Sequence, residues 1–137
     1  MKKLSLLLSA IAFVLTIGLQ SCGGGAGTNT PGNAVKKSFN LLADKKFDKV
    51  VEMYVKKDGS AFTDEERAKI SGLMNMASVD LEKKKGIKSL EITEEKISDD
   101  GKTANVKWKV VYGNEETDTE DGELMNINGE WKLVIGN

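Results

Sequence analysis

Hydrophobic positions change their spacing along the chain, recurring every three to four residues before Gly86 and every second residue after it. In the first half, Asn33 is expected to cap one helix, and a second short helix is expected to run up to the Asp58-Gly59 turn. Their apolar faces comprise Val35, Phe39, Leu42 and Ala43 in the first helix, and Phe47, Val50, Val51, Tyr54 and Val55 in the second.

A third helix has the clearest start and stop signals. Thr63 and Glu66 have the spacing of a capping box, in which each side chain binds the backbone N–H of the other residue. Three lysines precede Gly86, where positive charge and glycine both favour the end of a helix. The predicted apolar stripe consists of Ile70, Leu73, Met74, Ala77 and Leu81.

Four strands are expected after Gly86. The alternation predicts strands at Ile87–Ile97, Thr103–Tyr112 and 116–127, and a closing strand with Trp131, Leu133 and Ile135 on one face. Asn128-Gly129 predicts a tight type I′ hairpin, since both central positions of that turn need a positive φ.

Helices followed by a four-stranded antiparallel meander indicate an α+β fold. The sheet alone would leave its aromatic side chains in water, so we expect the N-terminal helices to pack on a curved sheet and form a cone. A cavity at the open end of that cone is the predicted binding site. Its candidate lining residues are Tyr54, Trp108, Tyr112, Met125 and Trp131, and plain core packing is the favoured interpretation for each aromatic residue among them.

The first 21 residues have the layout of a secretory signal peptide: Lys2 and Lys3, then an apolar stretch, then a small residue before a cysteine. Leu19-Gln20-Ser21-Cys22 resembles the lipobox of bacterial lipoproteins. That resemblance implies cleavage before Cys22 and acylation of its thiol and of the new amine. The alternative is an ordinary leader with a coincidental cysteine. Residues 22–32 then form a lipidated flexible tether, and residues 33–137 form the folded domain.

The positions after Cys22 bear on which membrane holds the anchor. No aspartate follows Cys22 directly, and no acidic cluster occupies the first mature positions. Those are the patterns that resemble inner-membrane retention and surface export, respectively. We therefore expect a cell-envelope location, at the outer membrane and facing the periplasm.

Composition excludes several chemistries. The chain has one cysteine and no histidine, so an internal disulfide, a histidine-based triad and zinc sites of the His/Cys type are ruled out. No cofactor and no metal are expected; the acidic residues at 118–123 lack the spacing of a calcium loop and are interpreted as a solvated edge. The lysines are not interleaved with aromatic residues, which argues against nucleic acid as a partner.

Order and size resemble the nuclear-transport-factor-two-like (cystatin-like cone) superfamily, and more narrowly a family of small bacterial lipoproteins with a domain of unknown function. The likeness rests on the lipobox, the helical opening at 35–50, the strand Thr103–Tyr112 and the ending Gly129-Glu130-Trp131-Lys132-Leu133. It implies a fold and a location at the cell envelope, without an established activity.

The sequence allows two functions. The first is a non-enzymatic module that binds a small apolar ligand or an envelope protein, held at the membrane by its N-terminal lipid. The second is an enzyme, because the wider superfamily includes isomerases and dehydratases, with a carboxylate in the cavity as the base. No catalytic residue is assigned.

Overall fold

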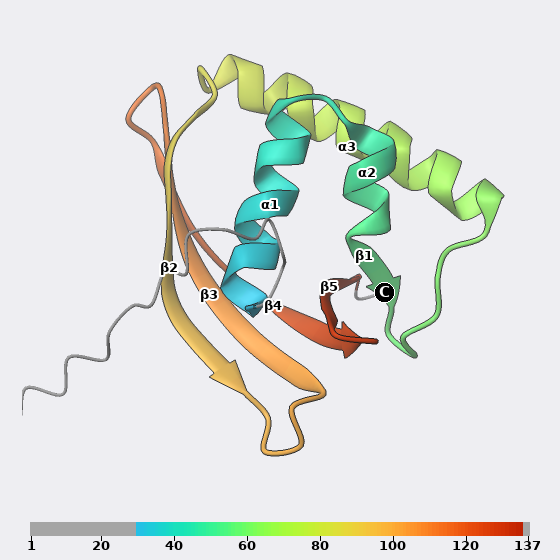
Figure 1. Ribbon diagram of the computed structural model, residues 1–137. Helices are drawn as coiled ribbons and strands as arrows, with labels where there is room; N and C mark the ends of the chain where they lie inside the picture. The colour runs from blue at the N-terminus through green and yellow to red at the C-terminus, as the bar shows by residue number, and fades with distance from the viewer. Residues whose placement is uncertain (1–29, 136–137) are drawn as a thin grey trace, which may run out of the picture.

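The computed structural model describes residues 30–135 of the chain. The predicted signal peptide (1–21), Cys22 and most of the predicted tether (22–32) lie outside these residues, so those assignments stay predictions. The described elements are α1 Pro31–Ala43, α2 Phe47–Glu52, β1 Tyr54–Lys56, α3 Asp64–Lys83, β2 Ile87–Ile97, β3 Thr103–Tyr112, β4 Thr117–Ile127 and β5 Glu130–Ile135 (Figure 1).

The strands form one mixed sheet in the order β1-β5-β4-β3-β2. Strands β2 to β5 are the predicted antiparallel meander, and the predicted α+β class is confirmed. The Asn128-Gly129 turn has φ values of 53° and 90°, as a type I′ hairpin requires. The sheet curves around α1, and α3 crosses the far side of α1 and α2 (Figure 1).

Strand β1 corrects the prediction for the second helix, which ends at Glu52 and not after Val55. Tyr54 and Val55 instead pair in parallel with Leu133 and Val134. Aromatic and β-branched residues suit either a half-buried strand or the end of an apolar helix, and here pairing with distant β5 decides between the two. The sheet therefore has a fifth strand.

The first helix also begins earlier than predicted. Thr30, and not Asn33, is the N-cap: the backbone N–H of Asn33 donates to Thr30 Oγ1 at 3.2 Å. Pro31 occupies the first helical position, where its missing N–H costs nothing. Pro31 and Gly32, assigned from the sequence to the tether, are thus buried parts of the domain.

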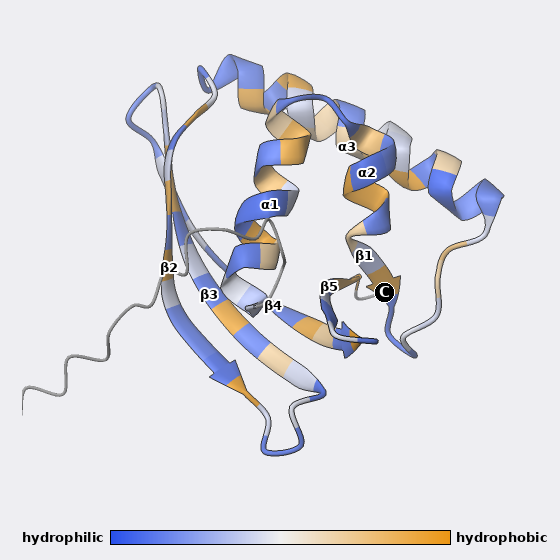
Figure 2. Ribbon diagram, viewed as in Figure 1, coloured by the Kyte–Doolittle hydropathy of each residue, from blue (hydrophilic) through white to orange (hydrophobic). Residues whose placement is uncertain are grey.

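The capping box of α3 is confirmed. Glu66 N–H donates to Thr63 Oγ1 at 3.3 Å, and Thr63 N–H donates to Glu66 Oε2 at 2.8 Å. The predicted apolar stripe is only partly right, because Leu73 is 63% exposed while Ser78 is buried. Hydrophobic residues recur around α3 (Figure 2), and it is the face with Met74 and Ser78 that turns inward.

The core lies between α1 and the face of the sheet that curves around it. Trp108 of β3 meets Phe39 of α1 edge to face, with ring centroids 6.1 Å apart. Its ring also lies against Gly122 of β4, where an added Cβ would come within 3.0 Å of the indole. Trp108 Nε1 is buried and has no hydrogen-bond partner among the described residues. The buried apolar residues around them include Ala34, Val35, Ala104, Val106, Val110, Leu124 and Leu133.

An ionic cluster attaches the C-terminal end of α3 to the sheet. Lys84 Nζ lies 3.0 Å from Asp118 Oδ2 and 4.1 Å from the ring centroid of Tyr112. Burial, together with a hydrogen bond to Asp118, raises the pKa of Tyr112 to about 12. Hydrogen bonds from Lys84 and Tyr112 lower the pKa of Asp118, so the Asp118 carboxylate is ionised at neutral pH.

Replacing Trp108 tests the unpartnered indole. Trp108→Phe keeps a ring against Phe39 and removes the N–H, so we expect the free energy of unfolding to change by less than about 1.5 kcal/mol. Trp108→Ala should lower it by about 3–5 kcal/mol, because it empties the core. Urea denaturation measures both. If Trp108→Phe lowered the free energy of unfolding as much as Trp108→Ala does, the indole N–H would have a stabilising partner.

Replacing Asp118 tests the ionic cluster. Because its folded pKa lies below the ordinary value of 3.8, the Asp118 charge stabilises the fold above that value, and this stabilisation is lost as pH falls through the folded pKa. Asp118→Asn should therefore lower the thermal midpoint at pH 7, and the two chains should converge in acid. Glu123→Gln, on the same strand, is the control. A difference that persists unchanged in acid would point to a packing effect.

Candidate ligand-binding site

Three of the five predicted cavity residues are core residues. Trp108, Tyr112 and Trp131 are 5%, 8% and 5% exposed, respectively. Tyr54 and Met125 are half-buried. Core packing thus accounts for the position of the three most buried aromatic side chains.

The remaining surfaces of these residues do not converge. Trp131 borders a groove of about 380 Å³ with Leu41 and Met53. Tyr54 borders a different depression, of about 450 Å³, with Gly59 and Phe62. The structure does not bring the five into one of the pockets that it describes, and their contact with a ligand stays a prediction.

The pocket that best combines an apolar floor with convergent polar groups lies elsewhere, between the loop that follows β1, the first turns of α3 and the end of β5. Its volume is about 420 Å³. We call it the α3–loop pocket. It is lined by Lys56, Lys57, Asp58, Phe62, Glu66, Lys69, Ile70 and Ile135.

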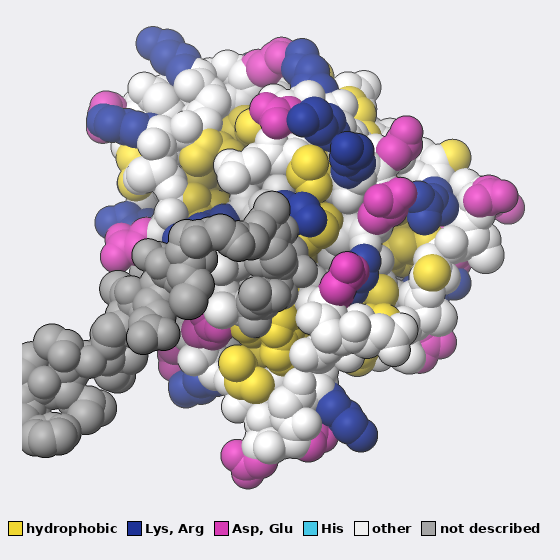
Figure 3. All heavy atoms as spheres, in the orientation of Figure 1, with side chains coloured by type: hydrophobic (Ala, Val, Ile, Leu, Met, Phe, Trp, Pro, Cys, Tyr) yellow, Lys and Arg dark blue, Asp and Glu magenta, His cyan; other side chains and the backbone are white. Residues whose placement is uncertain are grey.

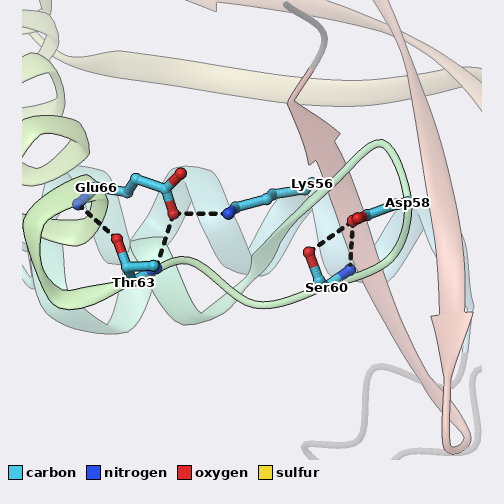
Figure 4. A network of polar contacts seen from close by, with 5 residues as sticks. All are labelled: Lys56, Asp58, Ser60, Thr63 and Glu66. Carbon is cyan, nitrogen blue, oxygen red and sulfur yellow. Dashed lines mark hydrogen bonds and ion pairs between the residues drawn. The ribbon is translucent and has the colours of Figure 1, made fainter.

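The Asp58-Gly59 turn shapes one wall of this pocket. Gly59 has a φ of 82°, a conformation that a side chain would strain. The Asp58 carboxylate accepts hydrogen bonds from the backbone N–H of Ser60 at 2.9 Å and from its hydroxyl at 2.6 Å (Figure 4). These bonds lower the pKa of Asp58 and hold the loop in place.

The capping box of α3 forms a second wall. Lys56 Nζ lies 2.8 Å from Glu66 Oε2, the same oxygen that accepts the Thr63 backbone N–H (Figure 4). The hydrogen bonds from Lys56 and from Thr63 lower the pKa of Glu66. Glu66 is therefore held as an ionised carboxylate that positions Lys56, which ties strand β1 to the start of α3.

The floor and the rim of the α3–loop pocket differ in chemistry. Phe62, Ile70 and Ile135 supply an apolar floor from three separate segments. Three lysines and the carboxylates of Asp58 and Glu66 surround it. Lys56 pairs with Glu66 and Lys69 pairs with Glu65, whereas Lys57 is exposed and within 4.0 Å of no carboxylate among residues 30–135. Such a site suits a small molecule with an apolar body and a negative group.

Sequence reasoning did not find this pocket. Phe62 and Ile135 are far apart in the chain, and only the parallel pairing of β1 with β5 brings them together. The Asp-Gly turn and the capping box were both visible in the sequence, but only as structural signals.

A second hollow lies between the start of α1 and β2. Its volume is about 600 Å³, and Glu91, Glu94 and Glu95 give its lining an acidic character. Lysines and carboxylates are otherwise interleaved over the face seen in Figure 3. The acidic residues at 118–123 were expected at an edge of the sheet, but they lie along β4, which is an interior strand between β3 and β5. Successive side chains of β4 point to opposite faces of the sheet.

Metal sites and membrane-spanning helices can be assessed for residues 30–135. In that range, no three histidine, cysteine, aspartate or glutamate side chains converge in a way that would hold a metal ion. Nor does any helix there have both the length and the apolar character needed to cross a membrane.

Comparisons with known proteins support the fold. No protein-family model and no curated protein matches the sequence. A crystal structure named as a candidate NTF2-like transpeptidase from Campylobacter jejuni superposes with a TM-score of 0.64 and 18% identity, covering 77% of this chain and 98% of that one. A SEC-C motif-containing protein from Rhodopseudomonas palustris gives 0.54 and 18%, covering 81% and 80%. The chain therefore has the NTF2-like fold expected from its sequence.

Proposed function

We propose that the protein is a lipid-anchored, non-enzymatic binding module of the bacterial cell envelope, and that its ligand occupies the α3–loop pocket. The observation that carries this proposal is the apolar floor of Phe62, Ile70 and Ile135 beside Lys57, a lysine that pairs with no carboxylate among residues 30–135. A volume of about 420 Å³ is in the range of small-molecule sites. The ligand class that fits is a small, largely apolar organic anion.

The charges of the pocket favour binding over acid–base catalysis. A general acid or base works best when its pKa lies near the operating pH. The carboxyl groups with a clear shift are instead held by hydrogen bonds below their ordinary pKa, Glu66 and Asp58 in the pocket among them. The same holds for Glu94, Asp100 and Asp118. An isomerase or dehydratase with a carboxylate base, the alternative, has no comparable support.

The anchor rests on the sequence of residues 1–22, with Cys22 as the acylated residue. Several acyl chains on one residue make an anchor that does not readily leave a bilayer. The glycine-rich segment up to Thr30 would hold the domain about 15 Å from the membrane. The absence of an aspartate after Cys22 favours the outer membrane, facing the periplasm.

Cys22→Ala tests the anchor. Because the thiol is the acceptor of the lipid, the variant should lose all incorporation of labelled palmitate. Radiolabelling of cells measures this incorporation. The matched control is Ser21→Ala, which keeps a small residue before Cys22. Label that remains on Cys22→Ala would refute the lipobox assignment.

A fluorescent apolar anion, anilinonaphthalene sulfonate, tests the α3–loop pocket. Lys57→Glu inverts a charge at the rim, so we expect the dissociation constant of the dye to rise by about tenfold, which corresponds to about 1.4 kcal/mol. Lys109→Glu, at an exposed lysine on β3, should leave the constant unchanged. Fluorescence titration measures both. Equal effects of the two substitutions would mean that the dye responds only to net charge.

Native mass spectrometry addresses the natural ligand. The protein is produced with its own leader, released from the envelope by cutting the glycine-rich tether, and weighed intact. A reproducible added mass of small-molecule size that Phe62→Ala abolishes supports a ligand in the pocket. If every preparation gave only the mass of the protein with no added ligand, the proposal would be contradicted.

A further inference from the structure

The outer face of α3 carries an unusual group of exposed hydrophobic residues. Leu73, Met76 and Val79 are 63%, 66% and 44% exposed, and the described residues contain only one other exposed large hydrophobic residue, Ile97. Single exposed hydrophobic residues are common on protein surfaces, whereas several on one helical face mark a contact surface. Figure 1 shows α3 as the outermost layer, with α1 and α2 on its inner side.

Positions spaced alternately four and three residues apart lie on this face, as along the seam of a coiled coil, and two of them, Met76 and Val79, are apolar. Starting at Glu65, the steps along the chain alternate between four and three residues, which keeps each position on one side of the helix. The seam positions are Glu65, Lys69, Gly72, Met76, Val79 and Lys83, with Leu73 and Asp80 beside them. The charged side chains on and beside the seam are 71% to 80% exposed and pair within α3, Lys69 with Glu65 at 2.7 Å and Lys83 with Asp80 at 3.1 Å.

The seam is complementary to itself. When two copies of α3 lie antiparallel and are centred on Met74, Glu65 of one copy lies opposite Lys83 of the other, and Gly72 lies opposite Met76. Lys69 then lies opposite Val79 and beside Asp80. A Cβ built on Gly72 would have no neighbour within 4 Å, so the face has an open notch at the position that meets the methionine.

We propose that this face binds the same face of a second copy of the chain, with the two α3 helices antiparallel. Charge selects both the partner and the direction. An antiparallel pair places the acidic first turn of one helix on the basic last turn of the other, whereas a parallel pair places Glu65 on Glu65 and Lys83 on Lys83. A two-fold symmetric contact requires this kind of self-complementarity.

The contact is small. From Glu65 to Lys83 the seam is about 27 Å long, and two such helices bury less than a standard interface. We therefore expect a reversible dimer with a dissociation constant on the order of tens of micromolar. The inference is independent of the ligand pocket, so a failed dye titration would leave it intact.

Sedimentation velocity measures the oligomeric state. The secreted chain with Cys22→Ser, which has no lipid acceptor, is run from about 5 to about 500 μM. We expect a monomer–dimer equilibrium that Met76→Glu weakens at least tenfold, because it places a charge on the notch of the second copy. Ile97→Glu, which alters the exposed hydrophobic residue outside α3, is the matched control and should leave dimerisation unchanged. A chain that stays monomeric throughout overturns the proposal and leaves the face to another protein or a lipid surface.

A charge swap tests the direction of the two helices. Glu65→Lys and Lys83→Glu should each weaken the dimer, and the double variant should restore it to within about threefold, because each new charge again meets its opposite. Circular dichroism checks that each variant is folded. If the double variant dimerised no better than either single one, the antiparallel pairing would be wrong.

Cysteine cross-linking tests the register. In the Cys22→Ser background, Gly72→Cys and Met76→Cys chains are mixed and oxidised. Antiparallel pairing should give mainly the mixed disulfide, because position 72 meets position 76 of the second copy. Disulfides formed only between identical variants would indicate parallel helices and overturn the proposed arrangement.

Discussion

The packing of Trp108 is the contact on which the rest of the structure depends. Its indole fills the space between α1 and the curved sheet, with Phe39 on one side and Gly122 on another. An aromatic side chain buried in this way contributes more to stability than any exposed ion pair of the surface. A Cβ at position 122 would come within 3.0 Å of the ring, so any other residue there would require the ring to shift. One side chain of β3 therefore contacts both α1 and β4, and β4 is also paired with β3 along its backbone.

Filling the interior in this way moves the open sites to the edges of the fold. Trp108, Tyr112 and Trp131 occupy the space that a ligand would take at the centre of a cone. The α3–loop pocket forms instead where β1 joins the sheet beside β5 and where α3 begins. This arrangement explains why the most favourable pocket lies away from Trp108, Tyr112 and Trp131.

The sequence predicted the elements whose signals are local. The alternation of Thr103–Tyr112, the Asn128-Gly129 turn and the capping box of α3 are each decided by residues that are close together in the chain. Strand β1 was missed because three residues form it and its partner lies near the end of the chain. The orientation of α3 was misjudged because hydrophobic residues lie on two of its faces, and only tertiary packing decides which face turns inward. The α3–loop pocket depends on both of these features, so it was not predictable from local pattern.

Ion pairs attach helix α3 to the rest of the domain near both of its ends. At its start Glu66 pairs with Lys56 of β1, and just after its end Lys84 pairs with Asp118 of β4. Exposed or half-exposed ion pairs are individually weak, and of the residues of α3 only Ser78 is fully buried. Elements with few buried apolar contacts open at a lower free energy than the core. The α3–loop pocket and the outer seam are thus both built on α3, which buries less apolar surface than α1 and the sheet do.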